Sequence, residues 1–219
     1  MITAIAVASL IGLIVVLFQL TIDWLGGEAL KAGLSTDASP TAIVIHGETL
    51  HIPQNMIRFA DQRRDGPAER IDLVLHWPTL TGYDETHANA FDDISADAPI
   101  VFVSIAPRMT EVDSTGRLVN LYARFFADGG PGPDGLERRS LLPGNGYDTE
   151  EIYFEAGSAH PFVARCTKPD GSGIPSNCLR EIYVGSNLSL TYRFRRPLLA
   201  EWAALDRGVS ALAASFLKK

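Results

Sequence analysis

The sequence has little cysteine and fewer basic than acidic side chains. Its two cysteines, Cys166 and Cys178, are separated by eleven residues. This is not the Cys-x-x-Cys spacing of thiol redox centres, so we expect no thiol chemistry. Lys and Arg number 19 against 26 Asp and Glu, which gives a net charge of −7. Non-specific nucleic-acid binding needs positive surface, so we expect no nucleic-acid partner.

Motifs for nucleophilic catalysis and for phosphate binding are also missing. No serine occupies a Gly-x-Ser-x-Gly elbow. The glycine-rich stretch GGPGPDG, residues 129–135, has neither the spacing of a dinucleotide fingerprint nor the Gly-Lys-Ser/Thr of a P-loop. We therefore expect no cofactor, and no catalytic residue can be named.

Charge is absent from residues 2–22, ITAIAVASLIGLIVVLFQLTI, of which 13 are Ile, Leu, Val or Phe. A helix of this length reaches about 31 Å, close to the ~30 Å hydrocarbon core of a bilayer. The run predicts a transmembrane anchor over residues 1–24 that contacts the lipid bilayer through residues 2–22. A cleaved signal peptide and a buried core helix are the alternatives. No Lys or Arg precedes the run, and it exceeds the ~7–15 apolar residues of a signal peptide.

The cysteines indicate the orientation of the chain better than the charges that flank the run. Only Lys31 lies close to its C-terminal end. A lone cysteine pair is typical of a disulfide in an oxidising compartment, so we predict a structural Cys166–Cys178 disulfide between antiparallel strands. This favours an inner-membrane, single-pass protein with its C-terminal part outside the cytoplasm, which is the periplasm in a Gram-negative cell. Residues 25–40 form the predicted linker and residues 41–219 one extracytoplasmic domain.

The first half of this domain combines short strands with long connections. Residues 56–70 are interpreted as a loop or a single helical turn, and residues 79–98 as a long acidic loop. Apolar residues at i, i+3, i+4 and i+7 predict an amphipathic helix over residues 116–127, followed by a glycine-rich loop. The predicted strands span residues 42–45, 49–52, 71–77 and 100–105.

The second half predicts an antiparallel β-meander and a terminal helix. The meander strands span residues 151–155, 162–167, 178–184 and 188–195, with turn residues between them. A helix of about 20 residues follows Pro197, because apolar residues then recur at spacings of four and three. We expect its stripe to pack on the sheet; a partner helix is the alternative. The stripe consists of Leu198, Trp202, Leu205, Val209, Leu212 and Phe216.

Two groups of residues are weak candidates for metal binding. The acidic loop carries Asp84, Glu85 and His87, with Asp92 and Asp93 further along, but its spacing matches no calcium loop. His46 and His51 lie on opposite arms of the predicted hairpin, where two imidazoles can bind zinc if the turn brings them together. We interpret the first group as a solvated loop and predict no metal site.

Alternation places several charged residues on the outward face of the predicted meander. We interpret them as cross-strand ion pairs, each contributing roughly 0.2–1 kcal/mol. A patch that binds an anionic ligand or a lipid headgroup is the alternative. The residues are Arg165, Arg193 and Arg195 together with Glu151, Glu155 and Glu181.

These patterns predict an α+β protein with a single N-terminal transmembrane helix. One antiparallel-sheet domain follows, with a mid-chain helix and a packed C-terminal helix. The leading hypothesis for function is a non-catalytic interaction or accessory module of the cell envelope with a protein partner there. A membrane-tethered hydrolase or a metal-dependent enzyme of unrecognised type is the alternative.

Overall fold

The computed structural model describes residues 33–144 and 146–217. Within these two ranges no helix has both the length and the apolar character needed to cross a membrane. The predicted anchor, residues 2–22, lies outside the described residues.

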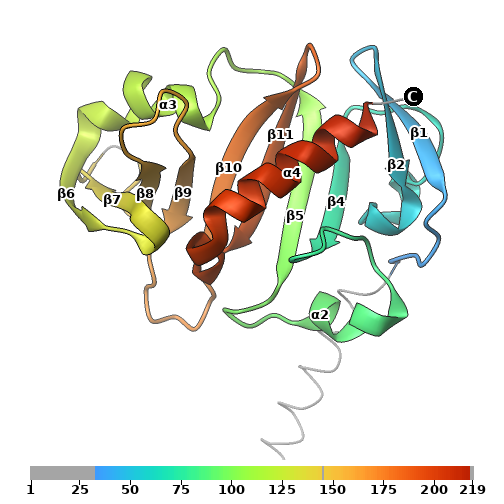
Figure 1. Cartoon of the computed structure of the whole chain (residues 1–219), viewed down its shortest axis with the longest axis horizontal. Coiled ribbons are helices and arrows are strands. Elements are labelled where there is room, and N and C mark those ends of the chain that lie inside the picture. Colours follow the sequence, from blue (N-terminus) through green and yellow to red (C-terminus); the bar gives the residue numbers. More distant parts are fainter. Residues whose placement is uncertain (1–32, 145, 218–219) are drawn as a thin grey trace, which may run out of the picture.

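An eight-stranded antiparallel sheet forms the centre of the structure (Figure 1). Its strand order is β4-β5-β11-β10-β9-β8-β7-β6, so the predicted meander occupies its middle as β8 to β11. In β4 and β11 every second residue is buried, as their alternation predicts. The strands are β4 (Ile71–His76), β5 (Ile100–Pro107), β6 (Phe126–Pro131), β7 (Leu136–Leu141), β8 (Glu150–Glu155), β9 (Val163–Thr167), β10 (Asn177–Val184) and β11 (Leu188–Arg195).

A smaller sheet lies beside the β4 edge. The predicted hairpin forms β1 (Pro40–Ile45) and β2 (Glu48–Pro53), and β3 (Gly66–Pro67) pairs parallel to β1. The segment interpreted as a loop or helical turn begins at the end of the 3-10 turn η1 (Gln54–Met56) and contains the 3-10 turn η2 (Ala60–Gln62) and β3. The carboxylate of Glu48 accepts hydrogen bonds from the backbone N–H groups of Ser186 and Asn187, which ties the hairpin to the β10–β11 turn.

The C-terminal helix packs on one face of the large sheet. The 3-10 segment η6 (Arg196–Glu201) leads into α4 (Trp202–Phe216), which crosses in front of β10, β11 and β5 (Figure 1). Leu205, Val209 and Phe216 of the predicted stripe are buried in the main core, whereas Trp202 is only half-buried. The apolar stripe therefore serves the core, as predicted.

The predicted helix over residues 116–127 is wrong in its length. The structure has α3 (Ser114–Asn120), a 3-10 turn η4 (Tyr122–Phe125) and then β6. Leu121 interrupts the helix with φ −129° and ψ −65°. This break directs Tyr122 into a second apolar cluster with Leu141, Ile152 and Val163. Packing against the sheet thus prevails over helical periodicity.

Strands β6 and β7 extend the sheet where a glycine-rich loop was expected. Gly129 pairs with Arg139 in the β6–β7 ladder. A Cβ atom at Gly129 would lie 2.9 Å from the backbone carbonyl oxygen of Arg138, so the close approach of these strands favours glycine there. The glycines that predicted a loop instead permit a crowded edge strand.

The acidic connection between β4 and β5 also contains more structure than predicted. It folds as a 3-10 turn η3 (Glu85–His87) and a short helix α2 (Ala88–Asp92). The carboxylate of Asp84 caps η3 by accepting from the backbone N–H of His87. Phe91 of α2 is buried against Val74 and Ile100, which fixes the connection on the sheet.

Candidate functional site

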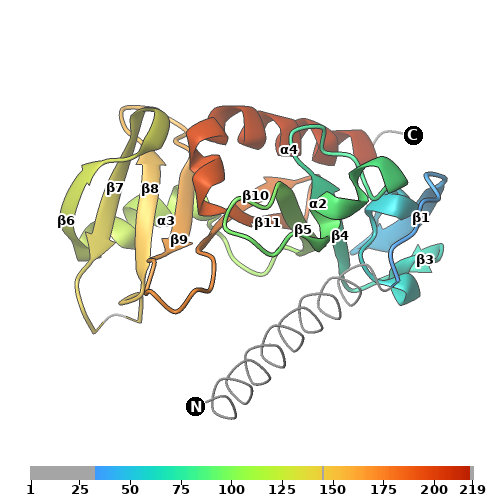
Figure 2. The same ribbon diagram turned by 90° about the horizontal axis from the view of Figure 1, so that it is seen from below.

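The face of the large sheet opposite α4 carries a continuous row of side chains. Residues paired directly across neighbouring strands share one face. Figure 2 shows α4 along the other side of the sheet. The row crosses all eight strands and alternates arginine with other residues: Val74, Phe102, Arg193, Leu179, Arg165, Ile152, Arg139 and Gly129.

The described residues cover both ends of this face but leave its centre uncovered. At one end the α2 connection packs on Val74, and at the other the η4 segment packs on Ile152. Between them lie three adjoining cavities of about 220, 230 and 310 Å³. Together they form a trough, whose floor is made by Phe102, Arg193, Thr191, Leu179 and Arg165.

The trough is a candidate contact surface because arginine and aromatic side chains meet in it. The guanidinium of Arg193 lies 4.9 Å from the ring centre of Phe102, the residue directly opposite it on β5. The guanidinium of Arg58, from the segment between η1 and η2, lies 5.0 Å from the same ring centre. Arginine and aromatic side chains in a concave surface are typical of protein-binding sites.

The predicted ion pairs on this face form only in part. Arg165 pairs with Glu150 at 3.2 Å, and Glu181 pairs with Arg117 of α3. Arg195 instead donates to the side-chain oxygen of Asn177 and to the backbone carbonyl of Ile94. Alternation thus placed the three arginines on the correct face but did not identify their contacts.

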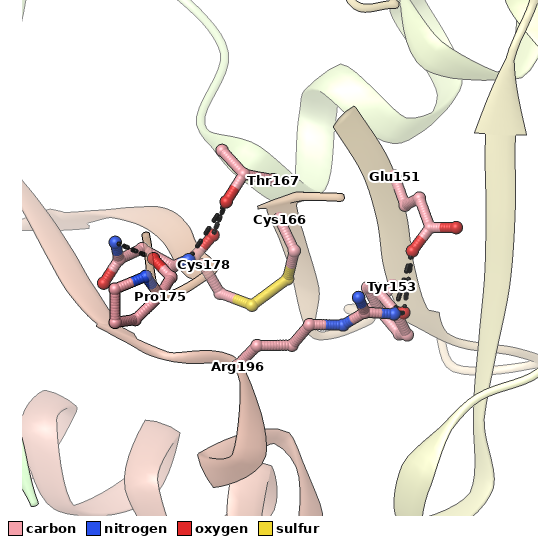
Figure 3. Close-up of a disulfide and its surroundings, with 8 residues drawn as sticks. Glu151, Tyr153, Cys166, Thr167, Pro175, Cys178 and Arg196 are labelled. Carbon is pink, nitrogen blue, oxygen red and sulfur yellow. Dashed lines mark hydrogen bonds and ion pairs between the residues drawn. A yellow bond between two sulfur atoms is a disulfide. The ribbon is translucent and has the colours of Figure 1, made fainter. Parts of the chain in front are cut away.

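Glu151 was predicted to face outward, and this is wrong. It lies opposite Cys166 on the helix side of the sheet and is buried. Its carboxylate binds Arg138 at 2.8 Å. It also binds Arg196 at 3.0 Å and accepts a hydrogen bond from the hydroxyl of Tyr153 (Figure 3). Burial alone would raise the pKa of Glu151, but these hydrogen bonds and charges lower it below its ordinary value.

The same close-up shows Cys166 and Cys178 joined by the predicted disulfide (Figure 3). The two cysteines face each other across β9 and β10, in the register expected from sequence. Both are fully buried in the main core. The bond closes the 169–176 loop at its base and has the position of a structural crosslink.

Arg180 is buried beneath α4 and forms an ion pair with Asp206 of that helix. Its Nε donates to Asp206 Oδ1 at 2.8 Å, and its Nη2 donates to Oδ2 at 3.2 Å. The hydroxyl of Tyr192 donates to the same carboxylate at 2.8 Å. Burial, and then the charge of Asp206, raise the pKa of Tyr192 well above its ordinary value. This network connects α4 with the sheet.

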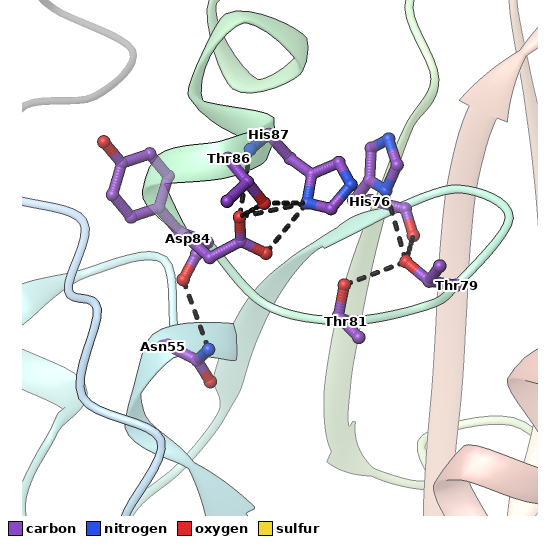
Figure 4. A network of polar contacts seen from close by, with 8 residues as sticks. Asn55, His76, Thr79, Thr81, Asp84, Thr86 and His87 are labelled. Atoms are coloured by element: carbon purple, nitrogen blue, oxygen red, sulfur yellow. Dashed lines mark hydrogen bonds and ion pairs between the residues drawn. The ribbon is translucent and has the colours of Figure 1, made fainter.

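The acidic loop forms a polar network with a histidine from β4 (Figure 4). The Nδ1 atom of His87 lies 2.9 Å from Asp84 Oδ2, and the rings of His87 and His76 are 4.3 Å apart between centres. Hydrogen bonds from Thr86 and His87 lower the pKa of Asp84. Burial and the charge of His87 lower the pKa of His76.

This network does not have the ligand set of a metal centre. No group of three His, Cys, Asp or Glu side chains arranged to hold a metal ion occurs in residues 33–144 and 146–217. His46 and His51 are not brought together, because His51 lies opposite Ala42 while His46 occupies the turn itself with φ 49°. Oriented by Asp84, His87 still has the arrangement of a general base.

Sequence reasoning missed Arg58 and Phe102 as site residues. Phe102 belongs to a strand that was predicted, but its run is apolar on both faces and gives no sign of exposure. Arg58 lies in a segment interpreted as a solvated loop or a helical turn. No sequence pattern relates a loop arginine to a strand 44 positions away.

Comparison with known proteins gives two remote structural neighbours. No protein-family model matches the chain, and no curated protein sequence matches it significantly. One neighbour is Smlt3025, an immunity protein of the Stenotrophomonas maltophilia type IV secretion system, with a TM-score of 0.56 and 14% identity over 83% of this chain and 94% of that one. Another is FrpD, an iron-regulated outer membrane lipoprotein of Neisseria meningitidis, with a TM-score of 0.54 and 11% identity over 85% and 96%. Identities this low show a shared fold.

Proposed function

We propose that this chain is a non-catalytic binding module of the cell envelope. Its apolar N-terminal run, residues 2–22, anchors it in the inner membrane, and residues 41–219 form the domain that lies outside the cytoplasm. The buried Cys166–Cys178 disulfide supports this location, because such bonds persist in oxidising compartments. The fold shared with an outer membrane lipoprotein agrees with an envelope position.

We further propose that the domain binds a protein partner through the trough. The observation that carries this proposal is the uncovered centre of the sheet face, where Phe102 and Arg193 lie between the covers formed by α2 and η4. Aromatic residues and arginine are enriched in protein interfaces and contribute much of their binding energy. The residues are held on rigid strands, so the surface is formed before a partner arrives.

By analogy with the immunity protein, we propose that the partner is a secreted protein which this chain holds inactive at the envelope. The shared fold and the exposed trough support this role. Purification of the full-length chain from its native membrane in mild detergent tests it. We expect one partner to co-purify in a fixed ratio with the wild-type chain.

Two matched variants make this experiment specific for the trough. Leu179→Glu places a charge on the trough floor, whereas Ala211→Glu places the same charge on the exposed surface of α4. We expect the first to lose the partner and the second to retain it, with unchanged thermal unfolding in both. Loss of the partner in both variants, or in neither, would refute binding through the trough.

The Asp84–His87 pair favours the alternative of a membrane-tethered hydrolase or metal-dependent enzyme. That alternative predicts that zinc raises the thermal midpoint of the wild-type chain and that His87→Gln abolishes the increase. Under our proposal neither zinc nor EDTA shifts the midpoint.

A further inference from the structure

Two guanidinium groups lie over one aromatic ring at the end of the trough. Arg193 and Phe102 are direct neighbours on β11 and β5. Arg58 reaches the same ring from outside the sheet, and its backbone N–H donates to the carbonyl of Asp72, which fixes the start of its side chain. The two positive charges are thus held near each other by attachments on different parts of the fold.

Neither guanidinium has an acceptor within residues 33–144 and 146–217. Among the described residues, no hydrogen bond from the side chain of Arg58 or Arg193 and no ion pair of either is found. Each guanidinium carries five N–H donors. Arg195 also lies near this ring among the described residues. Unlike Arg58 and Arg193, it donates hydrogen bonds, to the side chain of Asn177 and to the carbonyl of Ile94.

The two acidic residues in the cavities that Arg58 and Arg193 line have other hydrogen-bonding partners. The carboxylate of Asp93 accepts from the backbone N–H of Ser95 at 2.8 Å. Asp72 pairs with Arg70 at 3.0 Å and accepts from Gln62. Burial lowers the pKa of Arg193, and the nearby charges of Arg58 and Arg195 lower it further. Arg193 is exposed in the trough and Arg58 is half-buried, so both guanidinium groups are accessible to an anion.

We propose that Arg58 and Arg193 form a clamp that binds a single carboxylate of the protein partner, either an Asp or Glu side chain or the C-terminal carboxylate. This inference rests on the proposed function. Guanidinium groups bind carboxylates through short, charge-assisted hydrogen bonds, often two in parallel. Each guanidinium makes a cation–π contact with Phe102, which holds both groups near the ring before binding.

The walls of the cavity and the charge of the chain select the class of ligand. Leu34, Val74 and Phe91 give the cavity an apolar wall that suits the methylene groups of an acidic side chain. The net charge of −7 opposes an anionic bilayer surface and a doubly charged phosphate more strongly than a single carboxylate. A partner's carboxylate is therefore the occupant that these observations favour.

The first test is a titration of the full-length, ¹⁵N-labelled chain in detergent with sodium acetate at constant ionic strength. We expect the side-chain Nε–Hε signals of Arg58 and Arg193 to shift together and to saturate with one dissociation constant. Arg108 is the matched reference, because its guanidinium also stacks on a ring, 4.6 Å from the centre of Tyr183, outside the trough. Equal shifts at all three arginines, or none at Arg58 and Arg193, would overturn the clamp.

Substitutions give a second readout of the same binding. Arg193→Gln should weaken acetate binding at Arg58 by roughly 10- to 100-fold, the loss expected for a hydrogen bond between charged groups. Arg108→Gln should leave it unchanged. Phosphate and phosphatidylglycerol vesicles serve as competing probes. If the Arg58 and Arg193 signals shift with either probe but not with acetate, the ligand is a phosphate or a lipid headgroup and not a carboxylate. That result would overturn the proposal.

The co-purified partner separates failure of the clamp from failure of the proposed function. If Arg58→Gln/Arg193→Gln retains the partner while Leu179→Glu loses it, the clamp is wrong and binding through the trough stands. If the wild-type chain retains no partner, the proposed function fails. If acetate still binds in that case, the clamp binds a free carboxylate, and the proposal that it binds a carboxylate of a protein partner is refuted.

Discussion

The Arg180–Asp206 pair beneath α4 provides a quantitative test of how the helix is held on the sheet. The side chain of Arg180 is 7% exposed and that of Asp206 21%. Asp206→Ala removes both carboxylate contacts of Arg180 and the acceptor of the Tyr192 hydroxyl. Removing one partner of a buried pair typically costs 3–5 kcal/mol, because the other charge stays buried.

The contacts that Arg180 keeps, including a hydrogen bond to Thr115 Oγ1 at 3.4 Å, place the expected cost of Asp206→Ala at the lower end of this range. Arg180 still donates to the carbonyl of Val163 at 3.3 Å, and its guanidinium lies 4.8 Å from the ring centre of Phe162. We therefore expect a loss of about 3 kcal/mol in the free energy of unfolding. At about 2–4 °C per kcal/mol for a chain of this size, the thermal midpoint falls by roughly 6–12 °C.

Thermal unfolding of the full-length chain in mild detergent, followed by near-UV circular dichroism, measures this change. Glu137→Ala is the control, since its pair with Arg139 is about 40% exposed on each side and contributes at most about 1 kcal/mol. Replacing both partners with apolar residues, Arg180→Met/Asp206→Leu, should recover much of the loss. A cost below about 1 kcal/mol for Asp206→Ala would refute the reasoning.

Three further predictions concern the core, the disulfide and the histidine pair. Leu205→Ala should destabilise the fold by about 2–5 kcal/mol in chemical denaturation, because the side chain is fully buried under α4; a loss below 1 kcal/mol would contradict its packing. Cys166→Ala/Cys178→Ala should lower the free energy of unfolding by about 3 kcal/mol, because it removes the loop-closure entropy of a 12-residue separation. An unchanged midpoint would show that the bond adds no stability. Because the pKa of His76 is lowered in the folded chain, the unfolded chain binds more protons below about pH 6.5. The free energy of unfolding should therefore fall as the pH is lowered from about 7 to 5.5. His76→Phe should make this pH dependence less steep. Equal slopes in wild type and variant would remove His76 as the cause.

The sequence predicted those parts of the fold in which local pattern and tertiary packing agree. Residues 188–195 alternate strictly and form β11, and the terminal apolar stripe forms the buried side of α4. The cysteine pair fixed the register of β9 and β10, because a disulfide requires the two residues to face each other. In each case one periodicity described both the local element and its buried face.

The errors occur where tertiary contacts prevail over a local pattern. Helical spacing over residues 116–127 gave way at Leu121, because Tyr122 packs on the sheet instead. Strand β7 was missed because only its terminal residues, Leu136 and Leu141, are buried, so its sequence shows no alternation. A strand whose four middle residues are all half-buried has no signal with period two.

The candidate site was predicted only as a set of outward-facing arginines. Arg193 was placed on the correct face, but its relation to Phe102 depends on the pairing of β11 with β5, which are far apart in the sequence. Arg58 reaches the ring from an irregular segment and required the three-dimensional fold to be recognised. A site assembled from such distant segments leaves no motif.

The central claim, that the trough binds a protein partner outside the cytoplasm, is tested most directly by site-specific photo-crosslinking in intact cells. A photoreactive amino acid at position 179 lies on the trough floor, and one at position 211 lies on the exposed surface of α4. The account predicts one discrete protein adduct from position 179 and none from position 211, with the adduct accessible to protease added outside the inner membrane. An adduct from position 211 alone, or a protected one from position 179, would contradict the account.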